Sequence, residues 1–131
     1  MGQVLIVDDD PTLRELLREV LEEEGYSVIQ AAEGNAALDL LRSSPHGLVV
    51  LLDYLMPSGG GKRVLQIVSR DAALSTRHAF VLLTARMRIS APVLETAKTL
   101  SMPVVHKPFD LEALLVTVAE AQKRLEAGPS A

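Results

Sequence analysis

Three consecutive aspartates, Asp8 to Asp10, directly follow the apolar run VLIV at residues 4–7. Carboxylates about 4 Å apart repel by roughly 4 kcal/mol at an effective dielectric constant near 20, so a folded chain must offset this repulsion. A bound cation would do so. The chain has no cysteine, and ligands that are all oxygen favour a hard cation, Mg²⁺ before Zn²⁺. The pattern therefore predicts a Mg²⁺ site near the end of this run.

Three further polar side chains come at the ends of apolar runs in the same way: Asp53, Thr84 and Lys107. In a parallel sheet, the carboxyl ends of the strands meet at one edge, and ligands bind there. A cation held by carboxylates, beside an ammonium group and a hydroxyl, can neutralise and bind the oxygens of a phosphoryl group. The combination predicts phosphoryl-transfer chemistry at this edge.

Five short apolar runs alternate with segments of helical periodicity. Continuous apolar runs indicate strands that are buried on both faces of a parallel sheet. The expected strands cover residues 4–7, 27–31, 48–52, 79–83 and about 104–105. The expected helices begin at Pro11, with Gly25 ending the first, and then cover residues 35–42, 61–70, 92–100 and 111–125. This alternation predicts an α/β fold, a doubly wound five-stranded parallel sheet with two helices on one face and three on the other.

The length and composition predict one ordinary domain. The chain has 131 residues, of which 48% are hydrophobic, and a formal net charge of −4. This charge argues against direct binding of nucleic acid, which needs a basic face. No apolar run approaches the roughly 18 residues that a membrane span needs. We expect a cytoplasmic domain over residues 1–125, with residues 126–131 as a C-terminal tail or linker stub.

Four motifs at the predicted strand ends occur in the order found in one known family. They are VDDDP at residues 7–11, LLDYLMPSGGG at 51–61, LLTA at 82–85 and VHKPF at 105–109. With these motifs the chain resembles the receiver domains of response regulators in two-component signalling. The resemblance implies a flavodoxin-like (βα)5 fold of the chemotaxis-regulator kind, with strand order 2-1-3-4-5.

The resemblance also implies a role for each matching residue. Asp53 corresponds to the phospho-acceptor, Thr84 to the hydroxyl that binds the phosphoryl group, and Lys107 to the amine that pairs with it. The carboxylate of Asp9 would bind Mg²⁺ directly and that of Asp8 through water. The full implied set of Mg²⁺ ligands is Asp8, Asp9, Asp53 and the backbone carbonyl of Leu55.

The implied activity is a phosphorylation-controlled switch, not an enzyme that acts on other molecules. The Asp53 carboxylate would attack a phosphohistidine of a sensor histidine kinase or phosphotransfer protein in a Mg²⁺-dependent reaction, and the acyl phosphate would later be hydrolysed. The expected downstream partner is a protein target or a fused output domain, and phosphorylation-dependent dimerisation is a further expectation. A pseudo-receiver that serves as a non-phosphorylated scaffold is disfavoured, because the implied site is complete.

A competing interpretation comes from the same aspartates. Asp8, Asp10 and Thr12 spell D-x-D-x-T, which resembles the nucleophile motif of haloacid dehalogenase-like phosphatases, with Asp8 as nucleophile and Asp10 as acid/base. That family needs a further acidic pair after a late strand, which this sequence lacks, and the interpretation leaves Asp53 unexplained. Asp10 followed by Pro11 is instead typical of a helix start, with the aspartate at the N-cap.

Several positions concern structure or switching. Gly61 matches a family glycine, and Pro108 matches a proline that follows the lysine through a cis peptide bond. The position of a usual aromatic switch residue is Val104, so the aromatic half of the switch is missing. Leu55 and Arg86 occupy positions that influence the lifetime of the phosphoryl group. An apolar Leu55 cannot orient an attacking water, so we expect autodephosphorylation that is not of the fastest kind.

Without the aromatic residue, we expect the readout to depend on the loop at residues 86–89, the helix at residues 92–100 and His106. Apart from this role, His106 is predicted to be an exposed side chain on an edge strand. His46 and His78 fall in predicted loops and are expected to be solvated.

Overall fold

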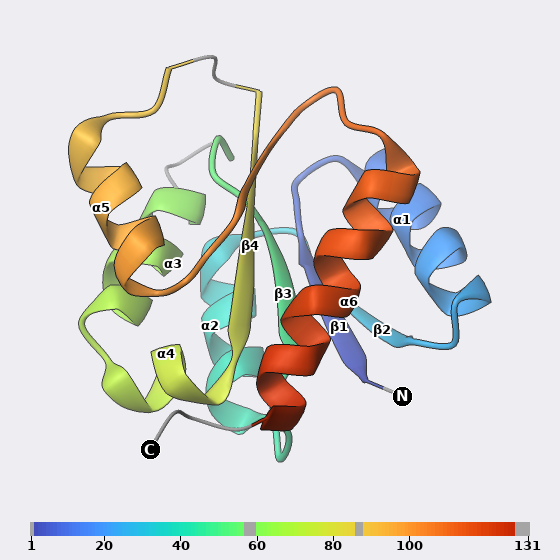
Figure 1. Ribbon diagram of the computed structural model, residues 1–131, viewed down its shortest axis with the longest axis horizontal. Helices are drawn as coiled ribbons and strands as arrows, with labels where there is room; N and C mark the ends of the chain where they lie inside the picture. Colours follow the sequence, from blue (N-terminus) through green and yellow to red (C-terminus); the bar gives the residue numbers. More distant parts are fainter. Residues whose placement is uncertain (1, 57–59, 86–87, 128–131) are drawn as a thin grey trace.

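A computed structural model describes residues 2–56, 60–85 and 88–127 of the protein (Figure 1). Its centre is a five-stranded parallel sheet in the order β2-β1-β3-β4-β5. The strands are β1 (Gln3–Val7), β2 (Ser27–Ala31), β3 (Val49–Asp53), β4 (Ala79–Thr84) and β5 (Val104–His106). The predicted fold class and strand order are therefore confirmed.

The apolar runs form strands because helices cover both faces of the sheet. Every residue of β3 and β4 is buried. Since successive side chains of a strand point to opposite faces, the sheet contributes to two hydrophobic clusters. Leu5 and Val50 belong to one cluster, and Val4 and Val49 belong to the other. A strand in this setting has no solvent face, so its sequence shows no alternation.

Two helices cover one face, α1 (Pro11–Glu23) and α6 (Leu111–Ala127), and both contribute buried side chains to the same cluster. The other face carries α2 (Gly34–Ser43), α3 (Gly60–Ser69) and α5 (Ala91–Thr99). Figure 1 shows the two sets of helices on either side of the sheet. The predicted division into two and three is confirmed for the long helices. The last helix runs two residues past its expected end at residue 125.

The sequence interpretation missed one helix, α4 (Ala72–Arg77), which packs on the same face as α3. It is capped by Asp71, whose carboxylate accepts hydrogen bonds from two backbone N–H groups, and it buries only Leu74. A helix of six residues with one buried side chain shows no apolar periodicity, which is the signal that sequence reasoning uses.

The expectation that His78 is solvated was wrong. His78 is 3% exposed, and its Nδ1 accepts a hydrogen bond of 3.0 Å from the backbone N–H of Leu48. Its Nε2 lies 2.9 Å from the carbonyl of Leu41 and therefore carries the proton. The ring fixes the end of α2 and the start of β3. His46 and His106 are exposed, as expected.

None of the helices in the described ranges combines the length and apolar character that crossing a membrane requires.

Candidate functional site

Three carboxylates meet at the carboxyl end of the sheet, the upper end in Figure 1. Each of Asp8, Asp9 and Asp53 offers an oxygen, and these oxygens all lie within 4.8 Å of one another. Asp8 and Asp53 are 1% and 4% exposed, whereas Asp9 is exposed. They come together because β1 and β3 are neighbours in register and both end at this edge. The oxygen-only donors, one of them open to solvent, suit a hard cation such as Mg²⁺.

Every polar group of Asp8 has a hydrogen-bond or ion-pair partner. Its backbone N–H donates to the carbonyl of Ala31 on β2 at 3.1 Å. Its Oδ1 accepts a hydrogen bond of 2.9 Å from the N–H of Asp10, and its Oδ2 lies 2.8 Å from the amine of Lys107. The side chain of Asp8 therefore has one fixed orientation at the floor of the cluster.

Lys107 reaches the cluster from the end of β5. Its backbone N–H donates to the carbonyl of Thr84 at 2.8 Å, which ties the ends of β4 and β5 together. Its Nζ lies 2.8 Å from Asp8 and 3.6 Å from Oδ2 of Asp53. One ammonium group is thus shared between two buried carboxylates. The peptide bond between Lys107 and Pro108 is cis.

Asp53 is the last residue of β3, and the pKa of its carboxyl group is shifted upward. Burial raises the pKa of its carboxyl, and the charges of Asp8 and Asp9 raise it further. Lys107 and a hydrogen bond of 3.2 Å from the N–H of Leu55 to Oδ1 lower this pKa, but the net direction is upward. The charged form of Asp53 is therefore disfavoured as long as no cation joins the cluster.

Thr84 ends β4 and is completely buried at the same edge. Asp53 pairs with Leu83 in the register of β3 and β4, so Thr84 extends one residue beyond Asp53 along the neighbouring strand. Its position places a hydroxyl-bearing residue between the strand that ends at Asp53 and the strand that precedes Lys107.

Gly61 lies beneath the loop that follows Asp53. A Cβ atom at this position would lie 2.0 Å from the carbonyl oxygen of Asp53 and 2.7 Å from that of Tyr54. Any other residue would push the backbone of α3 away from the end of β3, so glycine is needed for this close approach.

Asp10 does not join the cluster. Its carboxylate accepts hydrogen bonds from the N–H groups of Thr12 and Leu13 and caps α1, and Pro11 is the first residue of the helix. A carboxylate used in this way is a poor match for the acid/base of a D-x-D-x-T phosphatase.

Three other positions were singled out from the sequence, and the structure describes two of them, Leu55 and Val104. Leu55 is 41% exposed beside the cluster. Val104 is partly buried and packs against the cluster that includes residues of α5. Arg86, and with it part of the predicted readout loop, lies outside the described residues.

Sequence reasoning missed Arg14 of α1. Its Nη1 donates a hydrogen bond of 2.7 Å to the backbone carbonyl of Asp8, and its Nε donates one of 3.0 Å to Oε1 of Gln30. A signal was available, because a cation near the amino end of a helix opposes the helix dipole and therefore needs another reason to be there.

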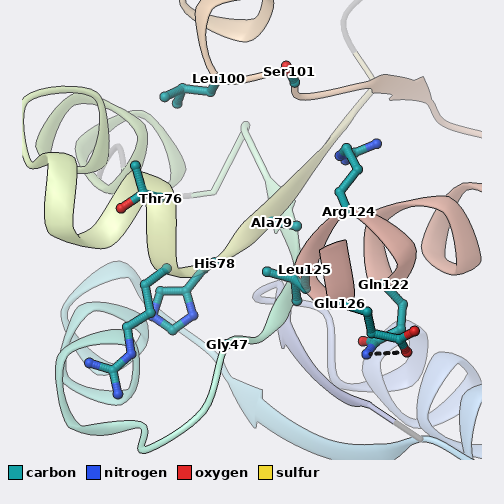
Figure 2. Close-up of a pocket in the computed structure, with 11 residues that line it drawn as sticks. Gly47, Thr76, His78, Ala79, Leu100, Ser101, Gln122, Arg124, Leu125 and Glu126 are labelled. Carbon is teal, nitrogen blue, oxygen red and sulfur yellow. Dashed lines mark hydrogen bonds between the residues drawn. The ribbon is translucent and has the colours of Figure 1, made fainter. Parts of the chain in front are cut away.

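A separate cavity of about 470 Å³ lies at the opposite end of the sheet (Figure 2). Gly47 precedes β3 and Ala79 begins β4, so this cavity lies at the amino ends of the strands. Ligands of such sheets bind at the carboxyl ends. The acidic cluster is therefore the better candidate site.

Comparison with known proteins agrees with this geometry. Residues 4–119 match the family model of the response regulator receiver domain. The chain is 43% identical over 88 residues to the transcriptional regulatory protein CpxR of Escherichia coli (strain K12), which covers 66% of this chain and 34% of that protein. It is 32% identical to sporulation initiation phosphotransferase F of Bacillus subtilis (strain 168), over 86% of each chain.

Solved structures show the same likeness. A CheY-like receiver domain protein from Methanospirillum hungatei JF-1 superposes with a TM-score of 0.79 and 31% identity, over 94% of this chain and 96% of that one. The response regulator TrrA of Thermotoga maritima, solved in complex with Mg²⁺-BeF, gives a TM-score of 0.76 and 30% identity, over 92% and 99%. This chain spans about half the length, or less, of several regulators that it matches. The chain belongs to the response regulator receiver domain family.

Proposed function

We propose that the protein accepts a phosphoryl group on Asp53 in a Mg²⁺-dependent reaction and signals by the resulting change in conformation. The observation that carries this proposal is the group of three carboxylates within 4.8 Å of one another, with the amine of Lys107 shared between two of them. This combination supplies a nucleophile, a set of metal ligands and a fixed positive charge.

In the proposed reaction, a carboxylate oxygen of Asp53 attacks the phosphorus of a phosphohistidine in line with the leaving nitrogen. The new P–O bond forms as the P–N bond breaks, and the imidazole leaves and takes up a proton. Lys107 pairs with a phosphoryl oxygen, and Thr84 donates a hydrogen bond to another.

Asp8, Asp9, Asp53 and the carbonyl of Leu55 would hold Mg²⁺. When bound, Mg²⁺ neutralises charge on the phosphoryl oxygens. Its charge also favours the ionised form of Asp53, which the buried cluster otherwise disfavours. The complex of TrrA with Mg²⁺-BeF supports this assignment by likeness.

The phosphoryl donor is proposed to be a sensor histidine kinase or a phosphotransfer protein. The curated relatives include transcriptional regulators of which the match covers only 34% and 52%, which supports a fused output domain. The likeness to sporulation initiation phosphotransferase F supports the other arrangement, in which the domain works alone and passes the group along a relay. With a net charge of −4, this domain is not expected to bind nucleic acid itself.

Treatment with acetyl phosphate, with Mg²⁺ or with EDTA, followed by a phosphate-affinity gel, tests the proposal. We expect a retarded band for the natural chain with Mg²⁺ only. Asp53→Asn should abolish this band, whereas Asp39→Asn, the same change at an exposed position of α2, should not. No retarded band at all would favour the pseudo-receiver. A band that persists in Asp53→Asn and is lost in Asp8→Asn would favour the dehalogenase-like phosphatase.

A further inference from the structure

Arg14 makes two hydrogen bonds that link three elements at the candidate site. One N–H group of its guanidinium donates to the backbone carbonyl of Asp8 at the end of β1, at 2.7 Å. Another donates to the side chain of Gln30 on β2, at 3.0 Å. Arg14 itself lies in α1, so its side chain ties the helix, β1 and β2 together beside the acidic cluster.

The helix alone does not explain these contacts. The amino end of a helix carries partial positive charge, so an arginine there is disfavoured. Arg18, one turn further along α1, behaves as a surface arginine usually does. It pairs with Glu15 and Glu22 of its own helix. Arg14 instead turns back toward the sheet.

The carbonyl that Arg14 binds belongs to the peptide unit between Asp8 and Asp9. A peptide unit is planar, so fixing the direction of its carbonyl also fixes the backbone N–H of Asp9 and limits where the Asp9 side chain can point. Asp8 has its own side-chain partners, Asp10 and Lys107. The carboxylate of Asp9, in contrast, makes no hydrogen bond or ion pair within the described ranges, and its position depends on its backbone.

We infer that Arg14 is a positioning residue for Asp9. By tying the carbonyl of Asp8 to Gln30, it holds the Asp8–Asp9 peptide in the orientation that presents the Asp9 carboxylate to the cluster. This role rests on the proposed function, because it is the Mg²⁺ affinity of the cluster that benefits.

If Arg14 positions Asp9, its removal should change the Mg²⁺ affinity in the direction opposite to that expected from charge alone. Removing a positive charge near three carboxylates should, by charge alone, strengthen the attraction for a cation. Removing a residue that orients a metal ligand should weaken binding, since loss of such supporting contacts typically costs about 10-fold to 100-fold in metal affinity. The two explanations can therefore be separated by direction.

The test is the dissociation constant for Mg²⁺ of the whole chain, measured by titration of amide shifts with Mg²⁺ alone. We expect Arg14→Ala to raise this constant about tenfold. Arg14→Lys should restore it only in part, because an ammonium group lacks the planar fork that reaches two acceptors at once. Gln30→Ala should weaken binding in the same direction. Arg18→Ala removes the same charge from the same helix and should leave the constant unchanged.

Equal or tighter Mg²⁺ binding by Arg14→Ala overturns the inference, as does full restoration by Arg14→Lys, which would show that charge is enough. If Arg14→Ala does not fold by circular dichroism, Arg14→Lys and Gln30→Ala carry the test, and both must then bind Mg²⁺ more weakly. A natural chain that binds no Mg²⁺ overturns the metal assignment in the proposed function as well, which the variants alone would not do.

Discussion

Asp53 is a buried carboxyl beside a second buried carboxylate, Asp8, and both share one amine. Its pKa is raised above the usual value of 3.8, first by burial and then by the charge of Asp8. A carboxyl with a raised pKa in the folded state contributes stability below its unfolded pKa and loses it as the pH rises through the folded pKa. At neutral pH and without metal, the proposed nucleophile is therefore a destabilising group.

We predict that Asp53→Asn makes the metal-free protein more stable at pH 7. The gain should be on the order of 1 kcal/mol, because a like charge about 4 Å away costs roughly 4 kcal/mol at an effective dielectric constant near 20 and Lys107 offsets much of it. Urea unfolding in EDTA measures this. The advantage should shrink as the pH falls toward 4, and Asp39→Asn should show no gain. A less stable Asp53→Asn at pH 7 would contradict the electrostatic account.

At the scale of the elements, strand ends decide what could be predicted from the sequence. The apolar runs before Asp8, Asp53 and Thr84 are long enough to place these residues at one edge of the sheet. The short helix α4 could not be found this way, since it buries one side chain. His78 was misplaced for a different reason, because its role depends on contacts with Leu41 and Leu48, which lie 37 and 30 residues away in the chain.

His78 joins the end of α2 to the start of β3 in a neutral form. Burial lowers its pKa, and the charge of Arg77 adds to this, against the hydrogen bond to Leu41. A histidine with a lowered pKa contributes stability above its unfolded pKa of about 6.5 and loses it as the pH falls below that value.

We therefore predict that the free energy of unfolding falls between pH 7.5 and 5.5, with a slope of up to about 1.4 kcal/mol per pH unit from this one proton. His78→Gln should be less stable at pH 7.5, by about 1–3 kcal/mol, because the buried backbone groups of Leu48 and Leu41 lose a partner. It should also lose this part of the pH dependence. His106→Gln, at an exposed position, should keep it. Equal slopes in both variants would rule out His78 as the cause.

The proposed switch would act through the ends of β4 and β5. Thr84 is in register with His106, and its carbonyl accepts the backbone N–H of Lys107. A change at Thr84 can therefore reach β5 through the backbone. Val104 has no ring that could change its packing, although it contacts the cluster that includes residues of α5.

We predict that a beryllofluoride mimic shifts the amide resonances of α5 and β5, including that of His106, in the presence of Mg²⁺. Asp53→Asn should show no such shifts, which controls for effects of the reagent. Unchanged resonances in α5 and β5 of the natural chain, together with shifts near Asp53, would mean that the readout takes another route.

At the scale of the whole molecule, the acidic cluster of Asp8, Asp9 and Asp53 concentrates negative charge at one end of the sheet, which a bound cation would neutralise. The fold could be predicted because local periodicity, strand ends and chain length all agree on one sheet. The contacts of Arg14 and His78 could not, because each depends on a particular distance between distant backbone groups.

We predict that Mg²⁺ stabilises the whole domain by mass action, by about 1.4 kcal/mol at a concentration tenfold above its dissociation constant. The melting temperature should rise with Mg²⁺ and return to its starting value with EDTA. Asp9→Asn should lose most of this rise, whereas Asp39→Asn should keep it. A melting temperature that does not respond to Mg²⁺ would contradict the assignment of the acidic cluster as a Mg²⁺ site.

The central claim is that the phosphoryl group is carried by Asp53, and borohydride trapping tests it most directly. Borohydride reduces an aspartyl phosphate to homoserine with release of phosphate, so the modified position can be read by peptide mass spectrometry after treatment with acetyl phosphate and Mg²⁺. We expect homoserine at position 53 and at no other aspartate, and only when Mg²⁺ is present. Homoserine at position 8, or at no aspartate, would contradict it.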